Sequence, residues 1–189
     1  MSYNAEEDYG DLGELDKLVL LLIDSQEKRY SRLARECILY REIFGDKNTF
    51  SFIFGESDDL DECIDALRCM TLIRTADPLG TELRYALTGN GRQLMMYIRS
   101  VTKDYATVDK VDKILKSTER ITDSHFTALI YHLFGGYTVS PLYVDVVESL
   151  ASCICLGNKA LREATEADII NAIKEGREVP IYSRQMRCD

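Results

Sequence analysis

The sequence predicts a mainly α-helical protein with a small β-hairpin or sheet. Apolar residues near the start of the chain recur at helical spacing, at Leu12, Leu15, Leu18, Val19 and Leu22. Two short apolar segments, 72–75 and 83–87, flank the sequence Asp77-Pro78-Leu79-Gly80, whose residue types suit a type I turn. With 189 residues, of which 46% are apolar, the chain is long enough to bury a core. We therefore expect one medium domain or two small ones.

The elements of the first half of the chain are expected in the following order. The first helix begins near Asp11 and is buried on most of its circumference, because its other side is also apolar. Ser31 is the expected N-cap of a second helix, which stops near Gly45. Residues 49–54 alternate, with three phenylalanines on one face, which predicts a strand. A third helix follows over residues 58–70.

A hairpin and a further helix come next. Tyr85 and Leu87 are two residues apart, so both side chains face the same side of the second hairpin strand and can pack on the helices. Thr88 is the expected N-cap of the helix that starts at Gly89. A helix, a hairpin with a polar tip and another helix, in this order, are typical of a winged helix-turn-helix. We assign residues 11–102 to such a domain.

The rest of the chain is expected to be helical. Asp123 is the expected N-cap of one helix, Ser140-Pro141 starts another, and a last helix begins at Thr165. Residues 105–176 therefore form either a helical extension that packs inward or a dimerisation region, and the sequence leaves both open. We expect a homodimer, since symmetric dimers are the commonest oligomers. Residues 1–10 and 177–189 are expected to be flexible termini.

Charge and cysteine content bound the function. The formal net charge is −9, which opposes non-specific binding to nucleic acid or to an anionic membrane. The polar, acidic N-terminus is unlike a signal peptide, and no apolar stretch is long enough to cross a bilayer. The six cysteines form no C-x-x-C pair and have no zinc-site spacing, so we expect reduced, buried thiols. These features predict a cytoplasmic protein that does not associate with membranes.

The hairpin and the helix after it resemble a known motif. The segment Tyr85-Ala86-Leu87-Thr88-Gly89-Asn90-Gly91 resembles the Tyr-x-Leu-Thr-x-x-Gly signature of MarR-like and PadR-like winged-helix regulators. Leu72-Ile73-Arg74 resembles the Gly-Leu-Ile-Arg segment of those families, with Thr71 where they usually have glycine. Phe54-Gly55-x-Ser57 before the third helix is similar to the prokaryotic YwgA-type winged-helix proteins. The resemblance covers residues 11–100 and implies a transcriptional regulator whose third helix enters the major groove.

The charges of that third helix oppose such a role. Its outward-facing acidic residues would be Asp58, Asp59, Asp61, Glu62 and Asp65, against Arg68 alone. Carboxylates are repelled by the phosphates that line a groove, and they contact bases only occasionally. The candidate DNA-binding residues are instead basic residues of the second helix and of the hairpin, namely Arg29, Arg32, Arg35, Arg74 and Arg84.

Two functions therefore remain open. The first is a winged-helix regulator that binds duplex DNA through its second helix and hairpin. The second is a winged helix that binds a basic protein partner through its acidic face and does not contact DNA directly. The resemblance places the regulator first. The sequence contains no catalytic motif, and His125 and His132 would lie about 10 Å apart along one helix, too far to share a metal ion. We therefore expect no enzymatic activity, no cofactor and no metal.

Overall fold

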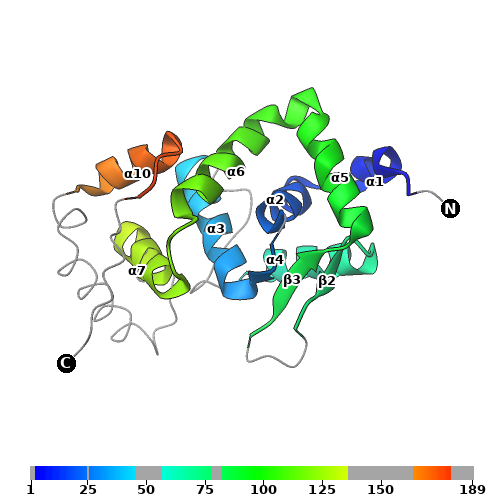
Figure 1. Ribbon diagram of the computed structural model, residues 1–189, viewed down its shortest axis with the longest axis horizontal. Coiled ribbons are helices and arrows are strands. Elements are labelled where there is room, and N and C mark those ends of the chain that lie inside the picture. The colour runs from blue at the N-terminus through cyan, green and yellow to red at the C-terminus, as the bar shows by residue number, and fades with distance from the viewer. Residues whose placement is uncertain (1–2, 25, 46–56, 78–81, 136–163, 180–189) are drawn as a thin grey trace.

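The computed structural model describes residues 3–24, 26–45, 57–77, 82–135 and 164–179 (Figure 1). The described residues form a mainly helical fold with a small three-stranded antiparallel sheet, which confirms the expected fold class at this level. The expected strand at 49–54, the hairpin turn at 78–80 and the helix starting at Ser140-Pro141 lie outside the described residues.

The elements follow one another closely along the chain. The N-terminal part contains α1 (Ala5–Asp11), α2 (Glu14–Ile23), β1 (Lys28–Arg29), α3 (Tyr30–Ile43) and α4 (Asp58–Cys69). The hairpin strands and the elements after them are β2 (Ile73–Thr75), β3 (Arg84–Leu87), α5 (Gly89–Ser100) and the short 3-10 helix η1 (Thr102–Asp104). The C-terminal part contains α6 (Tyr105–Thr118), α7 (Asp123–Phe134) and α10 (Glu166–Lys174).

Helix α2 lies at the centre of the core. All of its residues from Leu18 to Ile23 are at most 1% exposed. It packs against α3, α4, α5, α6 and β3, and Figure 1 shows it between α3 and α5. The expectation that this helix is buried on most of its circumference is therefore confirmed. Apolar residues on both sides of one helix require neighbours on both sides, which these elements supply.

The sheet has β3 at its centre, in the order β1-β3-β2. The predicted hairpin is confirmed, with Ile73 opposite Leu87 and Thr75 opposite Tyr85. Strand β1 pairs with the other edge of β3, with Arg29 opposite Arg84. This two-residue strand was not predicted, because two charged residues carry no alternating pattern.

The corner where β2 and α5 meet gives a physical role to Thr88 and Gly91 of the hairpin segment. Helix α4 ends at Cys69; Thr71 then has φ 58°, and the N–H of Leu72 donates to the carbonyl of Leu67, as in a Schellman motif. As predicted, Thr88 caps α5, because its Oγ1 accepts from the N–H of Gly91 at 3.1 Å. The same hydroxyl donates to the carbonyls of Thr71 and Leu72, at 2.6 and 3.1 Å. These contacts hold the start of α5 against the end of α4.

The starts of α3 and α7 differ from expectation. Helix α3 begins at Tyr30 and not after Ser31, because partners from the hairpin side satisfy its first N–H groups: Tyr30 N donates to the carbonyl of Leu83 and Ser31 N to Glu82. The N-cap of α7 is Thr122 and not Asp123, since the Thr122 hydroxyl accepts from the backbone of His125.

The N-terminal segment also differs from expectation. The first long helix, α2, begins at Glu14, and residues 5–11, expected to be mostly flexible, form α1. Tyr9 anchors α1, because its hydroxyl donates to buried Asp104 at 2.6 Å and its ring lies 4.6 Å from the ammonium of Lys17. These contacts, together with the packing of α1 on α5, fix a polar segment that has no apolar stripe of its own.

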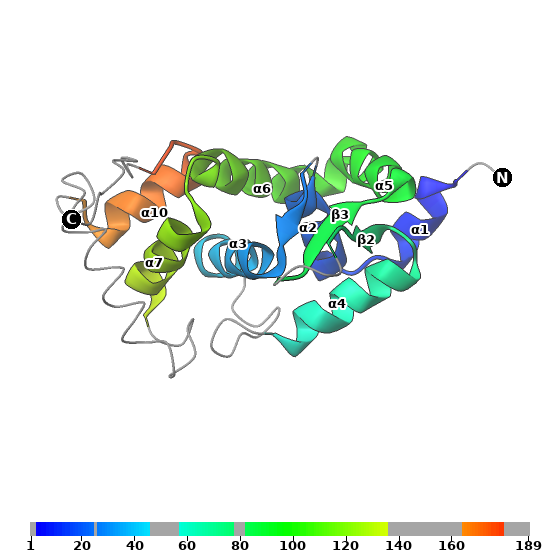
Figure 2. The ribbon, with the colours of Figure 1, turned by 60° about the horizontal axis from the view of Figure 1, so that its bottom comes forward.

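The C-terminal helices pack inward on the N-terminal half. Helix α6 contacts α2 and α3, α7 contacts α3, and α10 contacts α6. Buried residues of α6, α7 and α10, such as Ile114, Phe126 and Ile173, belong to the same core cluster as α2. Figure 2 shows α7 and α10 at one end of the molecule, α3 between them and α2, and α4 along the lower edge of the helical part.

Candidate functional site

Helix α4 presents a strongly acidic surface. Ser57 caps the helix by accepting from the backbone of Leu60. One face of the helix is buried, through Leu60, Cys63, Ile64 and Leu67. All five expected acidic residues are exposed on the other side, namely Asp58, Asp59, Asp61, Glu62 and Asp65. The exposed Arg68 donates to Asp65 at 3.0 Å, so its charge is already neutralised in part.

Arg32, a candidate DNA-binding residue, is instead an internal residue of the packed structure. Its side chain is only 12% exposed. The guanidinium donates to the carbonyls of Thr118 and Ile121, both at 2.8 Å, and to Glu36 at 3.0 Å. It also stacks on the ring of Phe126, 4.1 Å from the ring centroid. Arg32 therefore joins α3 to α6 and α7, and each of its three nitrogens donates one of these bonds.

The two other candidate arginines near the start of α3 also have carboxylates close to them. Arg29 is 3.3 Å from Asp123 and 3.9 Å from Glu82, and its side chain is 45% exposed. Burial lowers the pKa of Arg35, while nearby Glu82 and Asp123 act in the opposite direction. Together with Arg32, these residues form a basic group whose charge is largely compensated within the fold.

The two hairpin arginines are placed differently from each other. Arg74 on β2 is exposed and lies 3.9 Å from Glu27. Arg84 on β3 is half-buried and lines a cleft. The other signature residues of the hairpin, Tyr85, Leu87 and Gly91, are buried, which agrees with a structural role.

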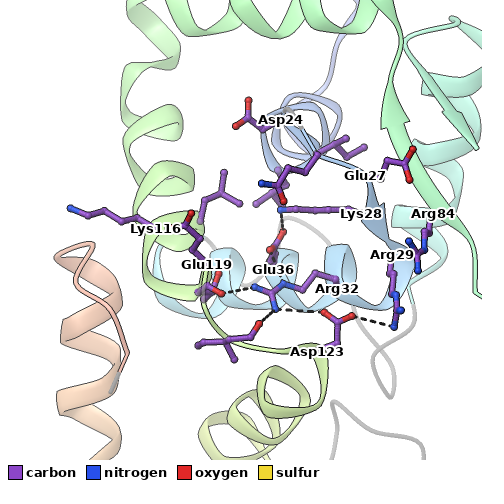
Figure 3. Close-up of a pocket in the computed structure, with 16 residues that line it drawn as sticks. Asp24, Glu27, Lys28, Arg29, Arg32, Glu36, Arg84, Lys116, Glu119 and Asp123 are labelled. Carbon is purple, nitrogen blue, oxygen red and sulfur yellow. Dashed lines mark hydrogen bonds and ion pairs between the residues drawn. The ribbon is translucent and has the colours of Figure 1, made fainter. Parts of the chain in front are cut away.

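The cleft beside Arg84 has a volume of about 620 Å³ and lies where the ends of α2 and α6 approach β1 and the start of α3 (Figure 3). Its basic lining residues are Lys28, Arg29, Arg32, Arg84 and Lys116. Its acidic lining residues are Asp24, Glu27, Glu36, Glu119 and Asp123. Local sequence patterns do not predict this cleft, because its walls come from segments that are distant in the chain.

A buried ion pair lies at the centre of the cleft. Lys28 and Glu36 form a close ion pair, and Glu36, whose side chain is 1% exposed, also accepts from Arg32. Burial lowers the pKa of Lys28, whereas the Glu36 carboxylate opposes that shift. The spacing of Arg32 and Glu36, four residues apart on one helix, is the one signal in the sequence that could have indicated part of this network.

Histidines and cysteines give no sign of a metal site among the described residues. No group of three histidine, cysteine or acidic side chains is placed there to hold a metal ion. His125 lies 2.6 Å from the hydroxyl of its own helix cap, Thr122. Cys37 and Cys63 are buried free thiols, as expected, and burial raises the pKa of both. Cys69, in contrast, is exposed, and Cys153, Cys155 and Cys188 lie outside the described residues.

Comparison of the chain with protein-family models, with curated proteins and with solved structures finds no match. Within the ranges that the structure describes, no helix is long and apolar enough to cross a bilayer.

Proposed function

We propose that the segment from α2 to β3 is a winged helix that serves as a protein-interaction module. The order α2, β1, α3, α4, β2, β3 and the strand order β1-β3-β2 support the winged-helix assignment. So does the close contact between the start of α5 and the carbonyl of Leu72, because it involves the threonine and glycine of the hairpin signature.

The observation that carries the interaction role is the charge of the exposed side of α4. Five carboxylates lie there, and the single arginine, Arg68, is paired with one of them. Such a surface repels the phosphates of a duplex and attracts the lysines and arginines of a protein. The partner class is therefore a protein with a basic surface.

The state of the α3 arginines supports the same proposal. A winged helix that binds DNA needs cations that release counterions from the phosphates. Arg32 is desolvated against Phe126, and Arg29 lies near two carboxylates. Freeing either one for phosphate would break ion pairs already present, so α3 offers little net attraction for DNA.

The test compares two variants with the same change in charge. The first, Asp61→Asn with Glu62→Gln and Asp65→Asn, removes charge from α4 and retains the two acidic residues at its N-terminus. The control, Glu6→Gln with Asp11→Asn and Glu166→Gln, removes three exposed charges from other helices. Proteins that bind the wild-type chain are identified and purified. Their affinity for the wild-type chain, the α4 variant and the control is then measured across a salt series.

We expect at least one partner whose binding weakens with salt, falls at least tenfold in the α4 variant and is unchanged in the control. Equal loss in both variants would show that only overall charge matters, and would overturn the role of α4. The mass of the complex, measured alongside, also tests the expected homodimer.

A second candidate function, binding of duplex DNA through the hairpin, is favoured by exposed Arg74 and by Arg84 on neighbouring strands. It predicts salt-sensitive binding of random duplex DNA that falls when both residues become alanine. Absence of binding at low salt, where attraction is strongest, would exclude this candidate.

A further inference from the structure

Arginine side chains line one end of the cleft, and carboxylates line the opposite end. Figure 3 shows Arg29 and Arg84 on one side of the cleft, Asp24 and Glu119 on the other, and Lys28 between them. We propose that this cleft binds a small zwitterionic molecule of amino-acid or dipeptide size, with its anionic group at Arg84 and its cationic group at the two carboxylates. This inference is independent of the role of α4.

The anion-binding end is formed by a pair of like charges. Arg29 and Arg84 are directly opposite each other in the β1–β3 ladder, an arrangement that is destabilising without a counter-charge. Arg29 already has two counter-charges, Asp123 at 3.3 Å and Glu82 at 3.9 Å. Among the described residues, no hydrogen bond or ion pair is seen for the Arg84 side chain. A carboxylate bound at the Arg84 guanidinium would supply the counter-charge that this residue lacks and would leave the ion pairs of Arg29 intact.

The cation-binding end is formed by two helix C-termini. Asp24 is the C-cap of α2 and Glu119 is the C-cap of α6. Helix C-termini carry partial negative charge, so each adds to the carboxylate beside it. Within the described part of the chain, neither carboxylate has an ion pair or a side-chain hydrogen bond. An ammonium group is the ligand chemistry that satisfies such a site.

The other charges of the cleft do not alter this polarity. Lys28 and Glu36 neutralise each other. Lys116 points away from that pair (Figure 3). Glu27 also lines the cleft, on the side of Arg84, but it is half exposed and lies 3.9 Å from Arg74, which compensates part of its charge. The lining thus has equal numbers of acidic and basic residues, which disfavours a ligand with a large net charge of either sign.

The volume sets the size of the ligand. About 620 Å³ falls within the usual range of small-molecule sites, roughly 300–1,000 Å³. A polar lining of ten charged side chains selects a polar ligand rather than an apolar one. These two properties together match a free amino acid or a dipeptide.

The experiment titrates the full chain with a panel of free L-amino acids and dipeptides by isothermal titration calorimetry. Each binder is repeated as its N-acetyl form, which lacks the cation, and as its C-terminal amide, which lacks the anion. We expect at least one zwitterion to bind, and both blocked forms to bind at least tenfold more weakly. Failure of every compound to bind would overturn the proposal, as would equal binding of a blocked form.

Matched variants locate the binding. Arg84→Gln is expected to weaken binding at least tenfold, whereas Arg74→Gln on the adjacent strand, outside the cleft lining, leaves it unchanged. Asp24→Asn provides a second variant from the opposite end of the cleft, and it removes the charge with almost no change in the size of the side chain. Equal loss in the Arg74 and Arg84 variants would show non-specific attraction and would refute the site. If Arg84→Gln does not fold by circular dichroism, retention of full affinity by Asp24→Asn would refute it.

Discussion

Gly91→Ala is expected to destabilise the protein by about 2–4 kcal/mol. A Cβ atom at this position would lie 1.9 Å from the carbonyl oxygen of Leu72 and 2.9 Å from its carbonyl carbon. Carbon and oxygen atoms come no closer than roughly 3.3 Å in weakly bonded contacts. Because the obstacle is backbone, it cannot rotate away, and α5 has to move by about 1 Å or more.

The magnitude follows from what that movement breaks. Overpacking of a well-packed region costs about 1–3 kcal/mol. The displacement also weakens the bonds that Thr88 makes to the carbonyls of Thr71 and Leu72, and loss of a helix cap costs about 1 kcal/mol. For a chain of this size each kcal/mol lowers the melting temperature by about 2–4 °C, so a drop of roughly 4–16 °C is expected.

The matched control is Gly89→Ala, in the first turn of the same helix. A Cβ at Gly89 meets nothing within 4 Å, and alanine favours helix more than glycine does. This variant should be as stable as the wild type or slightly more stable. The chain has no tryptophan, so urea and thermal unfolding are followed by far-ultraviolet circular dichroism. Wild-type stability of Gly91→Ala, or an equal loss in Gly89→Ala, would refute the steric argument.

Three further predictions concern other described residues. Thr71→Gly should stabilise the protein by about 1 kcal/mol in urea unfolding, because a β-branched residue at φ 58° carries strain that glycine lacks; a loss of stability would contradict this. Glu36→Gln should cost about 3–5 kcal/mol in the same assay, since it leaves two buried cations without their shared carboxylate, and a cost near zero would argue against a close network. In the native protein near pH 8, iodoacetamide should modify exposed Cys69 faster than Cys37 and Cys63, whose pKa values burial raises; mass spectrometry giving equal rates would exclude the burial of these two thiols.

Local signals predicted the hairpin and its helix well. The Thr88 cap, the strand from Arg84 to Leu87 and the buried first helix depend on residues close in sequence, and all three are confirmed. The start of α3 was placed after Ser31 because serine is a good N-cap, yet Glu82 and the carbonyl of Leu83 satisfy those N–H groups instead. That choice depends on tertiary contact, which no local pattern encodes.

The ion pairs and hydrogen bonds of Arg29 and Arg32 could not be predicted from local sequence patterns, for a similar reason. The sequence placed Arg29 and Arg32 among candidates for DNA contact, because basic residues on a polar helix face are usually solvated. The structure brings α7 and the end of α6 against that face, so Asp123 and two backbone carbonyls meet the guanidiniums. Nothing in the spacing of these segments, about 90 residues apart, indicates the contact.

The packing of α6 and α7 bears directly on the proposed choice of partner. If the chain ended after α5, the start of α3 would be an exposed basic surface next to the hairpin. Instead, the stacking of Arg32 on Phe126 removes one of its charges from solvent, and Asp123 neutralises part of another at Arg29. The exposed charge that α4 presents on the described surface is then predominantly negative. The C-terminal helices therefore alter the electrostatic character of the segment they cover, and this effect, rather than the element order alone, favours a basic protein over DNA as the partner.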